Sequence, residues 1–299
     1  MDKYIVKVSQ INNKLLNDLS NYISVCEYNY KSQMEKIVEY FKINSEIKFI
    51  LLAGPSSSGK TTTARLLKEC LEQNGFNAKS ISLDDFFVER VDTPLWDNGK
   101  PNYESVDSID WKLFSTCAHN LQTQGKSVMP TYDFITGTKS YNTELSLKQN
   151  DVIIIEGLHS LNPIIDNFIQ AKNSLKIYLA PSIMYLRDDE EIMNEITLRF
   201  FRRLIRDVYT RGSTPDKTLN EWDDVRRGEK LYIDPYKSTA NFSINSSHPY
   251  EVAIYKSIIK ELNLEQNERM KPLLKPFDNF VAIDKKSVPK DSLIQEFVH

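Results

Sequence analysis

The chain has 299 residues, enough for one large domain or for one domain with an appendage, and its formal net charge is only −3. A nearly neutral chain has no overall basic field to recruit nucleic acid, and this one has neither an apolar stretch long enough to span a membrane nor a signal-peptide pattern. Its three cysteines and four histidines form no disulfide framework and no metal-binding motif. We therefore expect a cytoplasmic protein without membrane or nucleic-acid partners.

The first 45 residues are expected to form an appendage to the main domain. Residues Tyr4–Val8 have the composition of a short strand. From Lys31 onward, apolar residues recur at the spacing of an amphipathic helix, namely Met34, Ile37, Val38 and Phe41. We interpret this helix as a packing element that leads into the first strand of the main domain.

A phosphate-binding motif follows at residues 54–62, which read GPSSSGKTT. They match the pattern G-x-x-x-x-G-K-[ST], and the required flanks are present as an apolar run at Ile47–Ala53 and a leucine-rich segment at Thr62–Gln73. Glycines let several backbone N–H groups and the helix N-terminus face an anion. Lys60 would reach the β- and γ-phosphates, and the Thr61 hydroxyl would ligate Mg²⁺. The motif therefore predicts a loop that binds a nucleotide.

Two carboxylates end the second predicted strand. The strand is Asn77–Leu83, and Asp84 and Asp85 follow it before two phenylalanines. Open α/β sheets bind their ligands at the carboxyl ends of the strands, and a surface turn rarely continues into two aromatic residues. We therefore favour a catalytic acid here over a surface turn. The next segment, residues 88–110, reads as a long loop, which in a compact domain is usually functional or disordered.

The following elements add an aromatic cluster and a third acid. Trp111–Gly125 has a helical pattern, and Met129–Phe134 combines aromatic residues with a carboxylate. Asp151–Gly157 then reads as a buried strand that ends in Glu156. A hydrophobic strand closed by an acid is the usual partner of a phosphate-binding loop, where the acid contacts Mg²⁺ or its water shell. Glu156 is therefore a candidate metal residue.

An arginine-rich helix is predicted after a further strand at Leu175–Leu179. The segment Asp188–Gly212 has the period of a long helix with an apolar stripe. The arginines away from that stripe are Arg199, Arg203 and Arg206, with Arg202 beside them and Arg211 before the final glycine. A solvated face would mix charges of both signs, whereas guanidinium groups bind phosphate through two parallel hydrogen bonds. We interpret the arginines as a phosphate clamp or lid, with a nucleic-acid patch as the alternative.

In this order, the motifs resemble the uridine kinase and phosphoribulokinase family of P-loop kinases. The resemblance runs from about Phe49 to Tyr250. It rests on GPSSSGKTT at 54–62, SLDDFF at 82–87, NYESVD at 102–107, PTYDF at 130–134, EG at 156–157, and RRLIRD at 202–207 through Arg211-Gly212. Because these motifs follow one another at the family's spacing, the resemblance is specific.

The resemblance implies a role for each of these residues. Asp84 would take the proton of the acceptor hydroxyl, with Asp85 as the open alternative, and Lys60 and Arg206 would complete the catalytic set. ATP would bind to Gly54, Pro55, Ser56, Ser57, Ser58, Gly59, Lys60, Thr61 and Thr62 of the loop and to Arg211. The acceptor would bind to Asp84, Glu104, Tyr132, Asp133 and Arg203. Mg²⁺ would bind to Thr61 and Glu156.

The chain departs from uridine kinases at two positions of the acceptor site. Glu104 stands where they carry an aspartate, and Gly137 stands where they carry a histidine that contacts the base. Both departures resemble a bacterial uridine kinase-like branch, whose N-terminal domain related to threonyl-tRNA synthetase is expected to be absent here. Because Gly137 offers only backbone, we expect sugar recognition to survive and the preference for pyrimidine bases to be weak or altered.

We therefore expect a P-loop α/β fold of three layers, with a mainly parallel sheet, helices on both faces and an arginine-bearing lid. The kinase domain would cover residues 46–270, followed by a tail of residues 271–299. The expected reaction transfers the γ-phosphate of Mg·ATP to a small-molecule hydroxyl, the 5′-hydroxyl of a nucleoside. The alternatives are a kinase of another small alcohol, such as a sugar phosphate or vitamin, and a regulatory ATPase without acceptor. The sequence leaves a homo-oligomer open.

Overall fold

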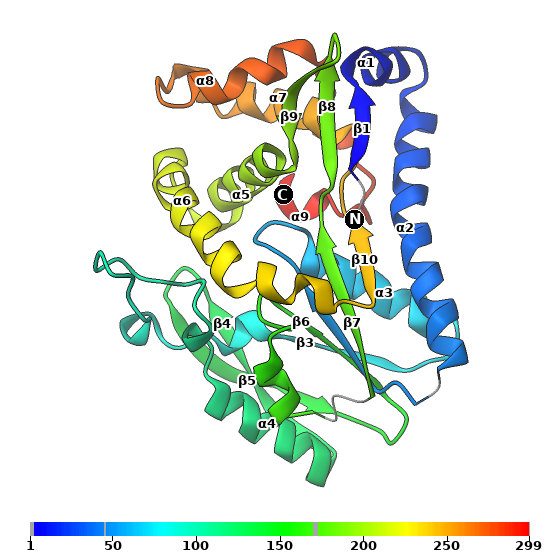
Figure 1. The fold of residues 1–299 in the computed structure, drawn as a ribbon, viewed down its shortest axis with the longest axis vertical. Helices are drawn as coiled ribbons and strands as arrows, with labels where there is room; N and C mark the ends of the chain where they lie inside the picture. The colour runs from blue at the N-terminus through cyan, green and yellow to red at the C-terminus, as the bar shows by residue number, and fades with distance from the viewer. Residues whose placement is uncertain (1–2, 45, 170–172, 299) are drawn as a thin grey trace.

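The structure is a computed structural model that describes residues 3–44, 46–169 and 173–298. Its centre is a five-stranded sheet in which neighbouring strands are parallel throughout (Figure 1). In spatial order the strands are β10 (Phe242–Asn245), β7 (Ser174–Ala180), β2 (Phe49–Ala53), β6 (Val152–Glu156) and β3 (Ala78–Ser82). The strands predicted near residues 50, 80, 154 and 177 are thereby confirmed, and β10 joins them at one edge.

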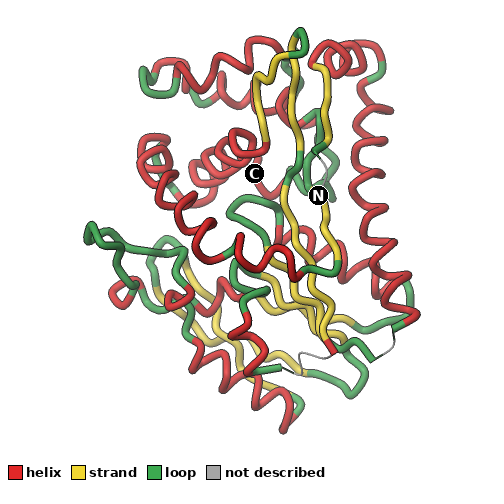
Figure 2. Tube along the Cα trace, viewed as in Figure 1, coloured by secondary structure: helices red, strands yellow, loops and turns green. Residues whose placement is uncertain are grey.

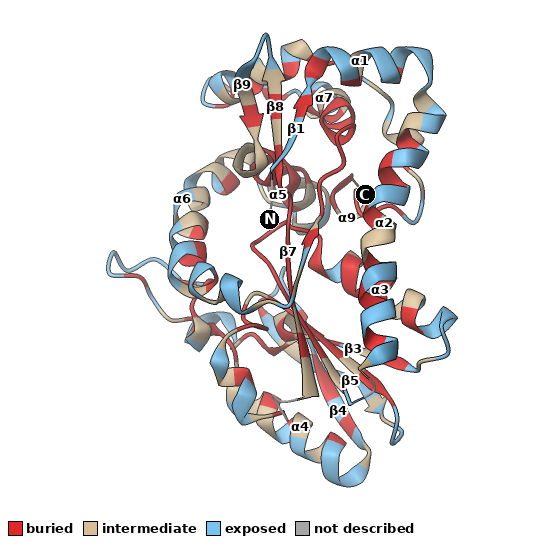
Figure 3. Ribbon diagram, turned by 45° about the vertical axis from the view of Figure 1, so that its right-hand side comes forward, coloured by how far each residue is buried: buried red, intermediate tan, exposed pale blue. Residues whose placement is uncertain are grey.

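Both faces of this sheet are buried, as an all-parallel sheet requires. Alternate residues of β2 point to opposite sides, because Ile50 and Leu52 belong to one hydrophobic cluster and Leu51 and Ala53 to the other. Figure 3 shows buried residues along β7 in the middle of the molecule. The first cluster is covered by α2 (Leu19–Ile43), α3 (Lys60–Gln73), α5 (Glu195–Arg211) and α7 (Glu251–Glu261), and the second by α4 (Trp111–Gln124). The predicted three-layer arrangement is confirmed.

The parallel sheet brings three separate motifs to one edge. The phosphate-binding loop connects β2 to α3, as predicted. Glu156 at the end of β6 lies opposite Leu52 of β2 and Ser82 of β3. Asp84 follows directly after β3. The loop, Asp84 and Glu156 therefore meet at the carboxyl end of the sheet, where open α/β sheets bind their ligands.

The arginine-rich helix begins later than predicted, because the residues before it form a hairpin. The hairpin consists of β8 (Ile183–Arg187) and β9 (Glu190–Asn194), which pair antiparallel. Asp188 and Asp189 form its two-residue turn with φ of 50° and 64°. Asn194 then caps α5 by accepting hydrogen bonds from two N–H groups of the first turn. The prediction of helix from Asp188 was therefore wrong up to this cap.

A second, smaller sheet has the strand order β1-β8-β9. β1 (Tyr4–Lys7) pairs parallel with β8, which confirms the short strand predicted near the N-terminus. α1 (Val8–Asn17) follows it. The predicted amphipathic helix is confirmed as α2, but it begins at Leu19 rather than near Lys31.

The N-terminal helices and the C-terminal tail share one hydrophobic cluster with the sheet. α2 packs against α3. The tail contains α8 (Lys271–Leu274) and α9 (Gln295–Val298), and α9 packs against α5. Leu293, Ile294 and Phe297 are 0 % exposed. Figure 1 accordingly shows the C-terminus in the middle of the molecule.

Two further elements lie beyond the central sheet. β4 (Lys126–Asp133) and β5 (Thr138–Ser146) form an antiparallel hairpin, and α6 (Pro215–Tyr232) follows α5. The segment 88–110 contains only 3₁₀ turns and isolated bridges, as predicted for a long loop, and Figure 2 shows most of it as loop. Within the described ranges, every helix is too short or too polar to cross a membrane.

Candidate active site

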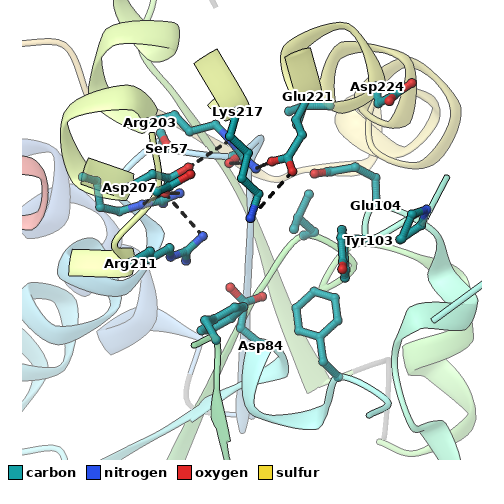
Figure 4. A pocket seen from close by; sticks show the side chains of 18 of the residues that line it. Ser57, Asp84, Tyr103, Glu104, Arg203, Asp207, Arg211, Lys217, Glu221 and Asp224 are labelled. Carbon is teal, nitrogen blue, oxygen red and sulfur yellow. Dashed lines mark hydrogen bonds and ion pairs between the residues drawn. The ribbon is translucent and has the colours of Figure 1, made fainter. Parts of the chain in front are cut away.

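A large pocket lies at the carboxyl end of the sheet, and Figure 4 shows it from close by. Its volume is about 1040 Å³, at the upper end of the range for a single small ligand, so that it has room for two substrates. Its lining comes from the phosphate-binding loop, the 88–110 segment, the β4–β5 hairpin, α5, α6 and the tail. The predicted site residues that line it are Ser56, Ser57, Gly59, Lys60, Thr61, Asp84, Glu104, Tyr132, Arg203, Arg206 and Arg211.

The phosphate-binding loop has the backbone geometry that an anion cradle needs. Ser57 and Gly59 have φ of 57° and 93°, a conformation in which successive N–H groups can point at one anion. A Cβ on Gly54 or on Gly59 would collide with neighbouring atoms, so that only glycine fits at these positions. The buried Lys60 ammonium donates to the carbonyl oxygen of Pro55 at 3.3 Å and therefore lies across the loop.

Thr61 and Glu156 form the candidate metal site. The Thr61 hydroxyl donates to Oε1 of Glu156 at 3.3 Å, and the Ser82 hydroxyl donates to the same oxygen at 2.7 Å. The other oxygen of Glu156, Oε2, is buried and has no hydrogen-bond partner among the described residues. Burial and the nearby Asp84 carboxylate raise the pKa of Glu156 to about 7. A free carboxylate oxygen beside a hydroxyl fits Mg²⁺, which prefers oxygen ligands.

The structure separates the two carboxylates that follow β3. Both lie in the 3₁₀ turn Leu83–Phe86. Asp84 lines the pocket, and Figure 4 shows its side chain at the bottom of the view. Asp85 instead forms a hydrogen bond with the neighbouring β4–β5 hairpin, in which its Oδ1 accepts from the backbone N–H of Tyr132 at 3.1 Å. Burial raises the pKa of Asp85. This arrangement favours Asp84 as the candidate base.

Glu104 is a buried carboxyl group in the pocket wall. The residue is 7 % exposed, and within the described part of the chain its Oε2 has no hydrogen-bond partner. Burial raises the pKa of Glu104 to about 7, although the Arg203 guanidinium opposes the shift. α6 can lie against Glu104 because Gly228 has no side chain. A Cβ at Gly228 would overlap the side chain of Glu104. A free carboxyl oxygen in a pocket wall is suited to bind a hydroxyl of a ligand.

Three aromatic rings form another part of the pocket wall. Phe87, Tyr132 and Phe134 contact one another with ring centroids 5.1, 5.7 and 6.0 Å apart. The Arg211 guanidinium lies over the Phe134 ring at 4.4 Å. Asp133, predicted at the acceptor site, is not brought into the pocket, because its carboxylate accepts backbone N–H groups of the following turn. Side chains alternate along a strand, so that Asp133 and Tyr132 point to opposite faces.

Arg90 occupies the space beside Gly137. A Cβ on Gly137 would lie 2.7 Å from Nε and 2.9 Å from Cζ of Arg90. The Arg90 guanidinium donates to the carbonyl oxygens of Phe134 at 2.7 Å and Ile135 at 3.1 Å. Arg90 lines the pocket. Gly137 offers only its backbone to a ligand, but a cation lies beside it. The motifs had not assigned this cation, Arg90, to the site, although its segment also carries Glu104.

Arg199 and Arg202 are buried in the core, with 4 % and 0 % of their surface exposed. Arg199 pairs with Glu229 of α6, and Arg202 pairs with Glu251 of α7 at 2.7 Å. Both guanidinium groups also donate to carbonyl oxygens of the phosphate-binding loop, at 3.2, 3.4 and 3.5 Å. The buried acids neutralise the two guanidinium groups, and the hydrogen bonds from these groups hold the loop in place. This corrects the prediction that Arg199 lies on an outward face with Arg203 and Arg206.

The other three arginines gather on Asp207 at the pocket wall. Asp207 forms ion pairs with Arg206 at 2.9 Å, Arg203 at 3.4 Å and Arg211 at 3.5 Å. Figure 4 shows Asp207 with Arg203 and Arg211 beside it. Burial alone would raise the pKa of Asp207, but the three guanidinium groups lower it below its ordinary value. Burial and the neighbouring Arg206 lower the pKa of Arg211 to about 10. Arg203 also pairs with Glu221 of α6 at 3.8 Å. Since the three cations meet only these two carboxylates in ion pairs among the described residues, a net positive charge remains for phosphate. The structure does not confirm that these arginines form a lid, because α5 lies within the core.

We expect Arg206→Lys to lower kcat/KM for ATP although it keeps the positive charge. Arg206 donates to Oδ1 of Asp207 through Nε at 3.1 Å and Nη2 at 2.9 Å, a planar fork that lysine cannot reproduce. The loss should be about tenfold or more, the value of one hydrogen bond to a charged group. Steady-state ADP release measures it, with Arg65→Lys in a surface pair with Glu69 as the control. Wild-type activity of Arg206→Lys would show that the Arg206 guanidinium does not contact the reacting phosphates.

α6 and Glu296 also line the pocket, although no sequence motif predicted them there. α6 contributes one polar face to it, including Lys217 and Glu221 (Figure 4). A signal for this helix was present, because Thr214 caps its N-terminus and Pro215 stands at its first position. A polar face toward a pocket looks the same in sequence as a solvated face. For Glu296 the sequence carries no signal, since its position depends on tail packing.

Comparison with known proteins identifies relatives of the chain. Residues 49–253 match the sequence profile of the Phosphoribulokinase / Uridine kinase family. The chain is 29 % identical over 205 residues to a uridine kinase of Lactobacillus helveticus, covering 68 % of this chain and 88 % of the relative. It is 29 % identical over 214 residues to a uridine kinase of Staphylococcus epidermidis, covering 70 % and 93 %. A solved structure described as a possible uridine kinase from Bacillus stearothermophilus has a TM-score of 0.44 and 17 % identity, and covers 71 % of this chain and 97 % of that chain.

Proposed function

The chain belongs to the phosphoribulokinase / uridine kinase family and is an ATP-dependent kinase of a hydroxyl group on a small molecule, and we propose that its acceptor is the 5′-hydroxyl of a nucleoside. The observation that carries the proposal is that Asp84 lines the same pocket as Lys60 of the phosphate-binding loop. A carboxylate that faces a phosphate-binding loop can accept the proton of an acceptor hydroxyl bound between them. A nucleotide switch that only binds ATP has no need of an acceptor base, which argues against the regulatory alternative.

On the nucleotide side, we assign the phosphates to the loop of residues 54–62. Catalysis of phosphoryl transfer depends mainly on positioning and on electrostatic stabilisation. Lys60 would hold the β- and γ-phosphates, and the arginines on Asp207 would neutralise the charge of the transferring group. Thr61 and Glu156 would hold Mg²⁺, which neutralises phosphate charge when it is bound.

On the acceptor side, we assign Asp84 as the general base. Asp84 would accept the proton of the acceptor hydroxyl. At the same time the hydroxyl oxygen bonds to the γ-phosphorus, and the bond between the γ-phosphorus and the leaving ADP oxygen breaks. The free carboxyl oxygen of Glu104 suits a ribose hydroxyl. The rings of Phe87, Tyr132 and Phe134 offer faces against which a base can pack. These groups together support a nucleoside over a smaller alcohol.

A panel of acceptors tests the proposal. ADP release is measured with uridine, cytidine, adenosine and guanosine, and with a sugar phosphate as the non-nucleoside acceptor. We expect turnover with at least one nucleoside and a 5′-monophosphate as the product. Turnover with the sugar phosphate alone would make the protein a kinase of another small alcohol. Steady ATP turnover that no acceptor stimulates would instead favour the regulatory ATPase.

We expect the choice of base to depend on Arg90, a revision of the weak selectivity predicted from Gly137. A guanidinium only donates hydrogen bonds. An exocyclic carbonyl oxygen, as on uracil, should therefore suit it better than the exocyclic amino group of adenine, which is itself a donor. Arg90→Ala should lower the ratio of kcat/KM for uridine to that for adenosine by about tenfold or more, because a hydrogen-bonding site discriminates strongly. Glu89→Ala, an exposed neighbour, is the control. An unchanged ratio would restore the prediction that only the backbone of Gly137 meets the base.

A further inference from the structure

The C-terminal tail places an acid on the phosphate-binding loop. Oε2 of Glu296 accepts the backbone N–H of Thr62 at 3.1 Å, and Glu296 lines the pocket together with Lys60 and Thr61. The N–H of Thr62 belongs to the first turn of α3, where unpaired N–H groups form the anion site of a phosphate-binding loop. A carboxylate of the chain itself therefore lies where a nucleotide would place a phosphate oxygen.

The backbone that carries Glu296 is held firmly in the core. Phe297 is 0 % exposed, and the guanidinium of Arg202 lies over its ring at 5.0 Å. Leu293 is also 0 % exposed and lies against Gly59, where a Cβ would overlap its side chain. Glu296 itself is only partly buried. The tail therefore has a fixed place beside the loop, and the side chain of Glu296 is the part that can move.

The charge of Glu296 is not neutralised by an ion pair. Among the residues that the structure describes, no lysine, arginine or histidine nitrogen lies within 4.0 Å of its carboxylate. A triphosphate in the loop would meet this carboxylate as a like charge and as a competitor for the Thr62 N–H. Both effects oppose nucleotide binding while the side chain remains in this position.

We propose that Glu296 gates the nucleotide site. In the nucleotide-free enzyme the Glu296 carboxylate accepts a hydrogen bond from the N–H of Thr62. When a nucleotide binds, its polyphosphate displaces the carboxylate from this N–H. Glu296 thereby sets the affinity for the nucleotide without taking part in phosphoryl transfer. The gate rests on the proposed ATP site alone and acts on the phosphates of the nucleotide. Its test therefore does not depend on which acceptor the enzyme phosphorylates.

Glu296→Gln is the direct test, because the amide keeps the size of the side chain and its oxygen can still accept a hydrogen bond, whereas the charge is lost. Calorimetry measures Kd for ATP, for tripolyphosphate and for adenosine. We expect Kd for ATP and tripolyphosphate to fall by about tenfold, the value of one charged contact, and Kd for adenosine to stay unchanged. Glu265→Gln, at an exposed acid in the same part of the chain, is the matched control and should change none of them.

Thermal unfolding without ligand separates gating from a structural role. A carboxylate at a helix N-terminus stabilises the helix, so that Glu296→Gln should lower Tm slightly while it tightens ATP binding. Glu296→Ala, which also removes the acceptor, should bind ATP at least as tightly as Glu296→Gln. Unchanged or weaker binding of ATP and tripolyphosphate in both variants would overturn the proposal. An equal gain for adenosine would overturn it too, because the effect would then lie outside the phosphate cradle.

Discussion

Lys60→Met is expected to lower the turnover number by about two orders of magnitude or more, the usual loss when one preorganised electrostatic contact is removed. Lys60 is 8 % exposed, and its ammonium group lies across the loop and donates to the carbonyl oxygen of Pro55. It is placed to meet the β- and γ-phosphates, whose charge the protein must stabilise during transfer. Methionine keeps most of the apolar stem, so that packing around the loop should change little. Steady-state ADP release measures the loss.

Lys68→Met provides the control for this prediction. Lys68 lies on the same helix and pairs on the surface with Glu72 at 3.9 Å. Exposed ion pairs contribute little to stability, so that this variant should retain both activity and Tm. If Lys60→Met kept near wild-type turnover while it remained folded, the loop would not hold the reacting phosphates, and the assignment of the nucleotide site would be wrong.

The sheet could be predicted because its strands are buried on both faces. Such strands read as continuous apolar runs, and Ile47–Ala53 and Asp151–Gly157 have this composition. The site could be predicted for a related reason. Strands that are parallel end at the same edge, so that an acid after each strand and a glycine-rich loop between strand and helix must lie close together. The family predicted from these motifs is the family that the comparison gives.

The hairpin β8–β9 could not be predicted from local pattern. Its turn, Asp188-Asp189, lacks the glycine that usually marks a two-residue turn. Its second strand, Glu190–Asn194, is short and half polar, and it runs directly into the helix. A helical period extended backwards from α5 therefore included residues whose conformation is set by pairing with β8.

The burial of Arg199 and Arg202 could not be predicted either. A buried guanidinium is tolerated only where an acid and further hydrogen-bond acceptors meet it. The acids here are Glu229 and Glu251, from two later helices. The other acceptors are carbonyl oxygens of the phosphate-binding loop and, for Arg202, the carbonyl oxygen of Ser246. Without the fold, an arginine that supports a phosphate site looks the same as one that contacts phosphate.

Asp84→Asn is expected to lower kcat by about 10²–10⁴-fold, the range of general-base catalysis, while Kd for ATP changes little. Asparagine has nearly the shape of aspartate, but its amide does not accept the proton of an acceptor hydroxyl. Asp84 lines the pocket with Lys60 and Thr61, so that a hydroxyl bound there can be reached both by the carboxylate and by a γ-phosphate. Single-turnover kinetics with saturating ATP and nucleoside would place the loss in the chemical step.

Asp85→Asn is the matched control, since it makes the same change one residue further along the same 3₁₀ turn. Oδ1 of Asp85 accepts the N–H of Tyr132, and the amide oxygen of asparagine can accept the same hydrogen bond. Asp85→Asn should therefore remain within a few-fold of wild type. The opposite result, with Asp85→Asn inactive and Asp84→Asn active, would assign the base to Asp85. Because the two carboxylates are adjacent in sequence but face different partners, this pair of variants separates proton transfer from positioning of the β4–β5 hairpin.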